Sequence, residues 1–360
     1  DQRGKKRMIN LLNLSILEFK DQLKTLGIKP FVAVQVFDWI FKKHKGNFDD
    51  MPNISKDIRK KLKEAFVIRS FSKVDVMHSE KGNASKFVLT LHDGLQVECV
   101  ALKEKKYWTL CISSQVGCPI DCKFCLTGVM GFKRQLAAHE IVEQVLTVMQ
   151  SGLEISRLVF MGMGEPLLNY DAVFTAIDQL NSEDTYYLSK RKMTVSTSGL
   201  MQGIKRLITD ERYINLAFSV GSTDLLIREK IMPLEKRNPF VEVVRLLHEY
   251  QKMHNRKLTL EYTVLKGQND STLAISGLIN LSKYLNAKVN LINLNPHEKI
   301  PFSPVSKKDL EEIKKVILAA KVPVTIRYEK GQDITAACGQ LGESGISELG
   351  VKKGVSVDGK

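Results

Sequence analysis

The chain has 360 residues, 43% of them hydrophobic, which is enough for one large domain and a smaller one. It contains no run of about 18 uncharged apolar residues, so the sequence predicts no transmembrane helix and no membrane contact. The 54 Lys and Arg residues exceed the 40 Asp and Glu residues, for a net charge of +14. This excess favours a polyanionic partner, because each neutralised phosphate releases counterions.

The cellular location is inferred from the terminus and the cysteines. Residues 1–7 are polar and include no apolar signal-peptide segment. Three clustered cysteines without a secretory signal indicate a reducing compartment and not disulfides. We therefore expect a cytoplasmic protein, with an organelle as the alternative if a targeting segment has been removed.

The predicted elements begin with a small helical domain over residues 1–75. Apolar residues recur at helical spacing between Ile16 and Leu26, and a second amphipathic run covers residues 32–41. A third helix is predicted after Ser55, which is a suitable N-cap. Because this domain carries many Lys and Arg residues, we interpret it as an RNA-binding accessory domain; a solvated lid is the alternative.

Residues 76–103 change to a β pattern. Two apolar runs flank His92-Asp93-Gly94, which predicts a β-hairpin that links the two domains. Over residues 104–341, short apolar runs then alternate with amphipathic ones. Strands are predicted at 109–114, 156–161, 192–197, 214–219, 257–264, 287–293 and 323–328, and helices at 137–151, 171–181, 200–208, 240–253, 272–285 and 307–320. The tail, residues 342–360, is rich in Gly, Ser and Lys and is predicted to be disordered.

Alternation of strands and helices predicts an α/β fold with a parallel sheet. The units are too few for an eightfold barrel, so we predict a partial (β/α)6 barrel, with the helical domain and the β-hairpin as extensions. In barrels of this type the chemistry lies at the carboxyl ends of the strands.

A cysteine loop follows the first predicted strand of the barrel. Cys118, Cys122 and Cys125 form a C-x3-C-x2-C pattern, one thiolate fewer than a closed four-cysteine iron–sulfur site uses. The fourth iron of a [4Fe–4S] cube would then be open to a substrate. A structural zinc loop is the alternative, but zinc sites favour C-x2-C pairs closed by a second pair.

Four sequence blocks occur in an order that is specific to one family. They are residues 109–132 around the cysteine loop, FMGMGEPLLN at 160–169, VSTSG at 195–199 and GQDITAACGQL at 331–341. In this order they resemble the RNA adenine methyltransferases of the radical S-adenosylmethionine (SAM) superfamily, over nearly all of residues 10–341. The resemblance is greatest to the adenine-C2 branch, whose substrates are 23S rRNA and certain tRNAs. It implies a radical-SAM barrel, a [4Fe–4S] cluster, two SAM molecules per methyl group, a flavodoxin-type electron donor and a monomer.

The resemblance also implies roles for two further cysteines and a glutamate. One SAM would methylate Cys338, and a radical from the second SAM would remove a hydrogen from that methyl group. The resulting radical would add to adenine C2, giving a covalent protein–RNA bond. Glu98 would accept the ring proton, and Cys111 would resolve the adduct by forming a disulfide. From the residues alone, the cysteines could instead be buried structural thiols and Glu98 a residue on the surface of a strand.

The SAM-binding positions of the family match seven residues: Gly164, Glu165, Ser196, Ser219, Val220, Gly221 and Asn295. Glycine allows the backbone to approach the ligand, and the Glu165 carboxylate can bind the ammonium group of SAM. The family usually has histidine at the position of Gly221, so this loop lacks an imidazole while its backbone contacts are expected to remain. Gln332 also replaces an acidic residue that is common before the methyl-carrying cysteine.

Two other functions stay open. A related branch of the family methylates adenine at C8 with the same cysteine set, although Pro166–Asn169 and Thr109-Leu110 favour the C2 branch. A non-catalytic RNA-binding factor that keeps the fold is supported only by Gly221. The sequence does not distinguish rRNA from tRNA as substrate, because a basic surface binds phosphates and does not read bases.

Overall fold

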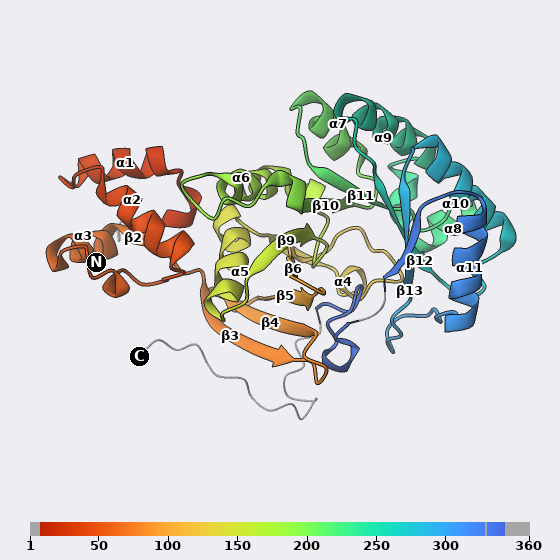
Figure 1. Ribbon diagram of the computed structural model, residues 1–360, viewed down its shortest axis with the longest axis horizontal. Coiled ribbons are helices and arrows are strands. Elements are labelled where there is room, and N and C mark those ends of the chain that lie inside the picture. The colour runs from red at the N-terminus through yellow and green to blue at the C-terminus, as the bar shows by residue number, and fades with distance from the viewer. Residues whose placement is uncertain (1–7, 328–329, 343–360) are drawn as a thin grey trace, which may run out of the picture.

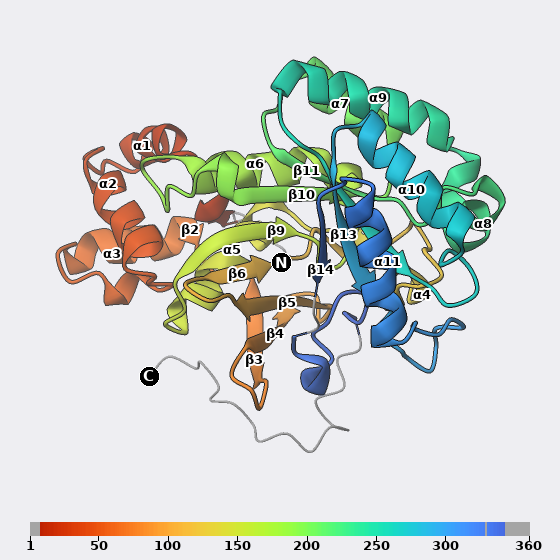
Figure 2. The same cartoon turned by 45° about the vertical axis from the view of Figure 1, so that its right-hand side comes forward.

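The computed structural model describes residues 8–327 and 330–342. Its main feature is a ten-stranded sheet in the order β14-β13-β12-β11-β10-β9-β6-β5-β4-β3. Figures 1 and 2 show helices α7, α9, α10 and α11 on the outside of this curved sheet, and helices α1–α3 in a separate lobe. No helix in the described ranges is long and apolar enough to cross a membrane.

Seven neighbouring strands of the sheet are parallel and form the predicted partial barrel. Their bounds are β6 Trp108–Cys111, β9 Ile155–Phe160, β10 Met193–Thr197, β11 Asn215–Ser219, β12 Thr259–Val264, β13 Lys288–Asn293 and β14 Val324–Arg327. The main helices between them are α5 Ala138–Gln150, α6 Tyr170–Asn181, α7 Met201–Thr209, α9 Phe240–His254, α10 Thr272–Tyr284 and α11 Lys307–Ala319. The predicted α/β partial barrel is confirmed: six strand–helix units precede the last parallel strand.

Several shorter elements were not predicted. They are α4 Leu126–Val129, α8 Leu225–Ile231, the antiparallel pair β7 Gln115–Gly117 and β8 Phe132–Gln135, and 3-10 turns at Leu11–Asn13, Phe48–Asp50, Pro166–Asn169, Lys190–Lys192, Pro233–Lys236 and Gln332–Ile334. Each is too short to show a hydrophobic period.

The antiparallel extension is larger than the predicted hairpin. Strands β3 Phe71–His78, β4 Ala84–Leu91 and β5 Gln96–Lys103 pair in series, and β5 pairs with β6 of the barrel. The predicted boundary at residue 75/76 therefore shifts to about residue 70, and 76–103 is part of the barrel sheet and not a linker between domains. Strand β3 was not predicted, because several of its side chains are only half-buried. Its sequence therefore lacks a clear alternation of apolar and polar residues.

The N-terminal module contains the three predicted helices. They are α1 Ile16–Thr25, α2 Val32–Phe37, which continues as a π-helical turn at Asp38–Lys42, and α3 Lys56–Ala65. The Ser55 side chain accepts a hydrogen bond from the Ile58 N–H, as an N-cap should. A short parallel pair, β1 Ile9–Asn10 with β2 Phe66–Val67, closes the module. The predicted disordered tail lies outside the described residues, apart from Gly342.

Glu143 of α5 joins the barrel to the start of β3. Its carboxylate accepts hydrogen bonds from the backbone N–H of Ser70 (2.5 Å) and of Phe71 (3.5 Å), and the residue is 5% exposed. Burial raises the pKa of Glu143 to about 7. The folded chain therefore holds this proton more tightly than the unfolded chain between pH ~4.5 and ~7, and stability falls as pH rises through that window.

We expect the Glu143→Gln variant to lose this pH-dependent fall. Relative to the variant, the wild-type protein should lose on the order of 1–3 kcal/mol of unfolding free energy between pH 5 and pH 8. Chemical denaturation at a series of pH values measures the difference. If the free energy of unfolding changes with pH in the same way for both proteins, Glu143 does not titrate in this range.

Candidate active site

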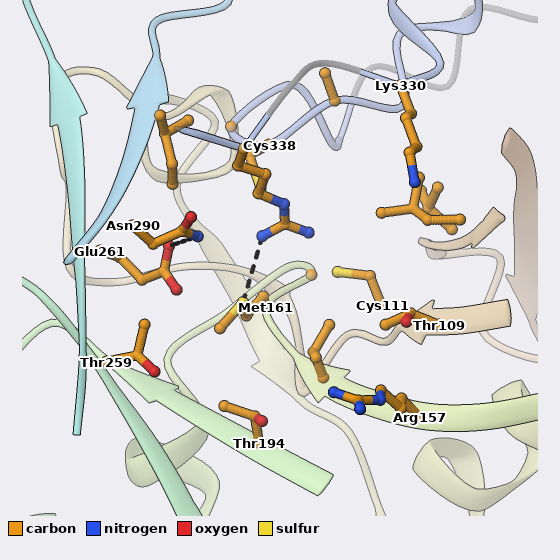
Figure 3. A pocket seen from close by; sticks show the side chains of 18 of the residues that line it. Thr109, Cys111, Arg157, Met161, Thr194, Thr259, Glu261, Asn290, Lys330 and Cys338 are labelled. Atoms are coloured by element: carbon orange, nitrogen blue, oxygen red, sulfur yellow. Dashed lines mark hydrogen bonds between the residues drawn. The ribbon is translucent and has the colours of Figure 1, made fainter. Parts of the chain in front are cut away.

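A cavity of about 650 Å³ lies inside the curve of the sheet. Inward-facing residues of β6 and of β9 to β14 form its walls, and residues 336–341 cover one side. Figure 3 shows Cys111 and Cys338 at this cavity, and Cys125 and Asn295 also line it. Four residues that the sequence predicted separately therefore meet in one space.

The cysteine loop is framed by the β7–β8 pair and by α4. The Cys118 N–H donates to the Gly131 carbonyl at 3.1 Å, directly after Gly117. Gly117 has φ +75°, and a Cβ at this position would lie 1.9 Å from the Gly131 oxygen. Only glycine fits here, so the backbone that enters the loop is determined by this contact.

The three thiols of the loop fit a [4Fe–4S] cluster by their chemistry. Burial, with smaller contributions from negative neighbours such as Cys125, raises the pKa of Cys118 to about 12. Burial likewise raises the pKa of Cys122 and Cys125, so three thiolates need a cationic group to stabilise them. In the described ranges no three His, Cys, Asp or Glu side chains converge on a single-ion site. A cube takes each thiolate at a different iron, so its ligands need not converge on one point.

The segment that carries Cys338 is held against the cysteine loop. The Leu126 N–H donates to the Gly339 carbonyl at 2.8 Å, and the Thr127 hydroxyl donates to the Leu341 carbonyl at 2.7 Å. The Asn295 side-chain amide donates to the Cys338 carbonyl at 2.9 Å, and it accepts from the Gln332 amide at 3.1 Å. These contacts explain how a cysteine far along the chain reaches the cavity beside Cys125.

Cys111 ends strand β6 and lines the same cavity as Cys338. It is 5% exposed, and burial raises its pKa to about 12. All six cysteines are free thiols in this structure. Cys99 is fully buried and does not line the cavity, so it packs as a core residue.

Glu98 is not a surface residue, and it does not line the cavity. It is 1% exposed, and its carboxylate lies 3.5 Å from the Lys86 ammonium, which is equally buried. The Gly342 N–H donates to Glu98 at 3.2 Å, and Lys86 donates to the Thr335 hydroxyl at 2.9 Å. The buried pair therefore lies directly under the segment that carries Cys338.

The predicted SAM contacts lie at the carboxyl ends of β9, β10 and β11. Gly164 and Glu165 follow β9, and the Glu165 carboxylate accepts from both the N–H and the hydroxyl of Ser198 at 2.8 Å. Burial raises the pKa of Glu165. Ser196 of β10 donates to the Phe160 carbonyl at 2.7 Å, so neighbouring strand ends are joined at this position.

The loop after β11 explains the departure at Gly221. Ser219 ends β11 and Val220 is fully buried. Gly221 has φ +68°, and a Cβ at this position would lie 2.3 Å from the sulfur of Met232. The left-handed backbone would strain a histidine here, and the flexible Met232 side chain would have to move, so the loop in its present form favours glycine.

Sequence reasoning missed Arg228 of α8, which is fully buried behind this loop. Its guanidinium donates to Glu235 at 2.8 Å, to the Ser198 carbonyl at 3.0 Å and to the Val220 carbonyl. It thereby joins the ends of β10 and β11, where SAM contacts are predicted. A charged residue within a short helix carried no signal for such a role.

Comparisons with known proteins agree with this geometry. Residues 9–68 match the ribosomal RNA large subunit methyltransferase N-terminal domain, and residues 112–276 match the radical SAM superfamily. A protein of Aquifex aeolicus named "Probable dual-specificity RNA methyltransferase RlmN" is 39% identical over 338 residues, covering 91% of this chain and 96% of the relative. The protein of the same name from Clostridium novyi is 38% identical over 335 residues, covering 93% and 98%.

A solved structure is also similar over the whole fold. The crystal structure of a radical SAM methyltransferase from Sphaerobacter thermophilus superimposes with a TM-score of 0.89 at 33% identity, covering 92% of this chain and 99% of that one. Membership of the radical SAM superfamily implies a [4Fe–4S] cluster and SAM, which the cysteine loop can accommodate. The chain therefore belongs to the RlmN family of dual-specificity radical SAM RNA methyltransferases.

Proposed function

We propose that this protein methylates C2 of a specific adenine in 23S rRNA and in tRNA, through a methyl group carried by Cys338. The observation that supports this most directly is the shared cavity, which holds Cys338, Cys111 and the cluster cysteine Cys125. When bound, the cluster supplies the electron that cleaves SAM. Cys118, Cys122 and Cys125 would hold it, and the strand ends around Glu165 and Ser196 would bind SAM.

Cys338, Glu98 and Cys111 would each carry out one part of the reaction. Cys338 attacks the methyl group of a first SAM and forms a thioether, and a second SAM is used to remove one hydrogen from that methyl. The methylene carbon bonds to adenine C2, so that the RNA is covalently attached to Cys338. The adduct gives back the one electron that SAM cleavage consumed, and the C2 proton passes to Glu98, which contacts the same segment through the Gly342 N–H. The Cys111 thiolate attacks the Cys338 sulfur, and the carbon–sulfur bond breaks with its electron pair left on the carbon. That carbon takes up a proton and becomes the methyl group of the base, and a Cys111–Cys338 disulfide remains.

The partners belong to the same proposal. The N-terminal module, residues 9–68, would bind RNA phosphates, and its helix α3 carries Lys and Arg residues along its exposed side. A flavodoxin-type protein would supply the electron, and the enzyme would act as a cytoplasmic monomer. The domain division, with this module followed by a barrel that ends in the catalytic cysteine, would allow RNA to contact both parts.

The decisive experiment uses the full chain with an anaerobically reconstituted cluster, a reductant, SAM with a deuterated methyl group, and transcripts of 23S rRNA fragments and tRNA. Mass spectrometry of the nucleosides should find 2-methyladenosine, and the labelled transcript would identify the substrate. 8-Methyladenosine would instead assign the protein to the C8 branch. No methylated base, despite an intact cluster, would support the non-catalytic alternative.

Replacing Cys111 with alanine should leave the RNA attached to the protein. Without this thiol nothing attacks the Cys338 sulfur, so the covalent adduct should accumulate to near one equivalent per enzyme. Denaturing gel electrophoresis with labelled RNA measures the adduct, and mass spectrometry locates it. Cys99→Ala is the matched control, because Cys99 is buried away from the cavity and should permit normal release. If Cys111→Ala releases free 2-methyladenosine at the wild-type rate, Cys111 is not the residue that resolves the adduct.

A further inference from the structure

One wall of the cavity is polar, although barrel interiors are usually filled with branched apolar side chains. Glu261 of β12, Asn290 of β13, and Thr325 and Arg327 of β14 all line the cavity, and we name these four residues the polar wall. Glu261 is paired with Asn290 in the strand register, and Asn290 with Thr325. Figure 3 shows Glu261 and Asn290 on the side of the cavity opposite Cys111.

The polar wall has hydrogen-bonding capacity that the protein does not use. Glu261 Oε2 accepts from the Asn290 amide at 2.7 Å, and Asn290 accepts from the Thr325 hydroxyl at 3.0 Å. Within the described ranges, Glu261 Oε1 accepts no hydrogen bond, and the Arg327 guanidinium donates a hydrogen bond only to the Met161 sulfur, at 3.6 Å. Yet Glu261 is 8% exposed, and burial of such groups is costly unless a ligand completes their hydrogen bonds.

The position of Arg327 relates the wall to the reactive sulfurs. Cys338 first, and then Glu261 and Cys111, raise the pKa of Arg327, because each lies close enough to attract the guanidinium. The guanidinium lines the same cavity as the carboxylate of the wall and the two thiols, and it lies near all three. A flat ligand against the wall would point one edge toward Cys111 and Cys338.

The wall lies deeper than the predicted SAM contacts. Glu261 and Asn290 are each the third residue of a six-residue strand, whereas the SAM positions lie at the strand ends. At the amino ends of the strands, the same cavity is bordered by Arg191, Lys192 and Lys288, which are exposed and form no ion pair with a described residue. These cations suit RNA phosphates. A nucleotide that enters between them would place its base at the wall.

We propose that the polar wall is the recognition site for the target adenine. Enzymes that act on a base read its edge by hydrogen bonds after extruding it from the stack. Glu261 accepts a hydrogen bond from the exocyclic amino group, and Arg327 donates to a ring nitrogen. Guanine is rejected, because its O6 is an acceptor and would face the Glu261 carboxylate. This inference rests on the proposed function, since it assigns the substrate base of that same site.

The test compares RNA that carries adenosine at the target position with RNA that carries purine riboside, which lacks the amino group. For the wild-type enzyme, loss of the amino group should lower kcat/KM roughly 10- to 100-fold, as expected for a hydrogen bond to a charged group. Glu261→Ala should show a similar loss with adenosine and no further loss with purine riboside. Glu261→Gln keeps an acceptor and should restore part of the discrimination. Persistence of the full discrimination in Glu261→Ala would overturn the proposal.

Two further variants separate recognition from structural damage. Arg327→Met should lower kcat/KM for both RNAs by the same factor, because adenosine and purine riboside share the ring nitrogens. Thr194→Ala is the matched control: Thr194 lines the same cavity from β10, outside the polar wall, and its discrimination should equal that of the wild type. Equal discrimination in every variant would show that the wall does not read the base.

Binding measurements keep this inference distinct from the proposed function. Fluorescence anisotropy gives the Kd of each RNA without catalysis, and the same pattern of discrimination is expected in Kd. If no 2-methyladenosine forms but wild-type binding distinguishes the two RNAs through Glu261, the methylation proposal fails and the recognition site stands. If 2-methyladenosine forms while Glu261→Ala discriminates between the two RNAs as the wild type does, the recognition site fails and the methylation proposal stands.

Discussion

The Cys338→Ala variant is expected to lose RNA methylation entirely, at least about 10³-fold, because Cys338 is the proposed methyl carrier and alanine has no sulfur to bear the methyl group. The substitution removes one sulfur and leaves the backbone contacts of Cys338 and Gly339 to Asn295 and Leu126 in place. The cluster cysteines are untouched. The loss should therefore be one of chemistry and not of folding.

Three measurements distinguish these causes. Transfer of labelled methyl from SAM to RNA should fall below detection, the visible absorption of the cluster should match the wild type, and 5′-deoxyadenosine should still form on addition of reductant. Cys99→Ala again serves as the control thiol and should methylate RNA. Methylation by Cys338→Ala above about 1% of the wild-type rate would require a different methyl carrier and would falsify the assignment.

The second large effect is expected at Arg228. Replacement by methionine keeps most of the volume but leaves Glu235, which is 9% exposed, as a buried carboxylate without its partner. Removing one member of a buried pair costs about 3–5 kcal/mol. The carbonyls of Ser198 and Val220 also lose the hydrogen bonds from Arg228, so the loops after β10 and β11 should loosen.

We therefore expect a marked fall in the midpoint of thermal unfolding and weaker SAM binding by calorimetry. Arg228→Lys keeps the charge but reaches fewer of the three acceptors, and should be intermediate. The matched control is Arg206→Met: Arg206 also pairs with a carboxylate, Asp171 at 2.6 Å, but it is 46% exposed and should cost less than about 1 kcal/mol. Equal effects at Arg228 and Arg206 would contradict the role of the buried network.

Much of the architecture could be predicted because the signals are local. Helices such as Lys56–Ala65 follow from an N-cap and a 3.6-residue period, and the barrel strands follow from short apolar runs between helices. The strand β3 could not be predicted in the same way, because its pattern makes sense only once it pairs with β4. The boundary near residue 70 is for this reason a tertiary property.

The candidate site likewise has residues that local sequence predicts and residues that it does not. Cys118, Cys122 and Cys125 are recognisable at once, because all three ligands lie within one loop whose spacing has meaning by itself. Cys338 and Cys111 could be assigned only through resemblance to a family, since nothing in the spacing of two distant cysteines says that they share a cavity. The structure supplies that relation through Asn295, Leu126 and Thr127.

By itself, then, the sequence determined the class of fold, the order of its strands and helices, and the cysteine loop, because each depends on residues a few positions apart. Tertiary structure alone decided that Glu98 is buried with Lys86 beneath the Cys338 segment and that Arg228 joins two loops. It also decided that Glu261 and Arg327 line the same cavity as Cys111 and Cys338. Side chains on different strands meet because of the register and curvature of the sheet, and a local sequence pattern predicts neither of these.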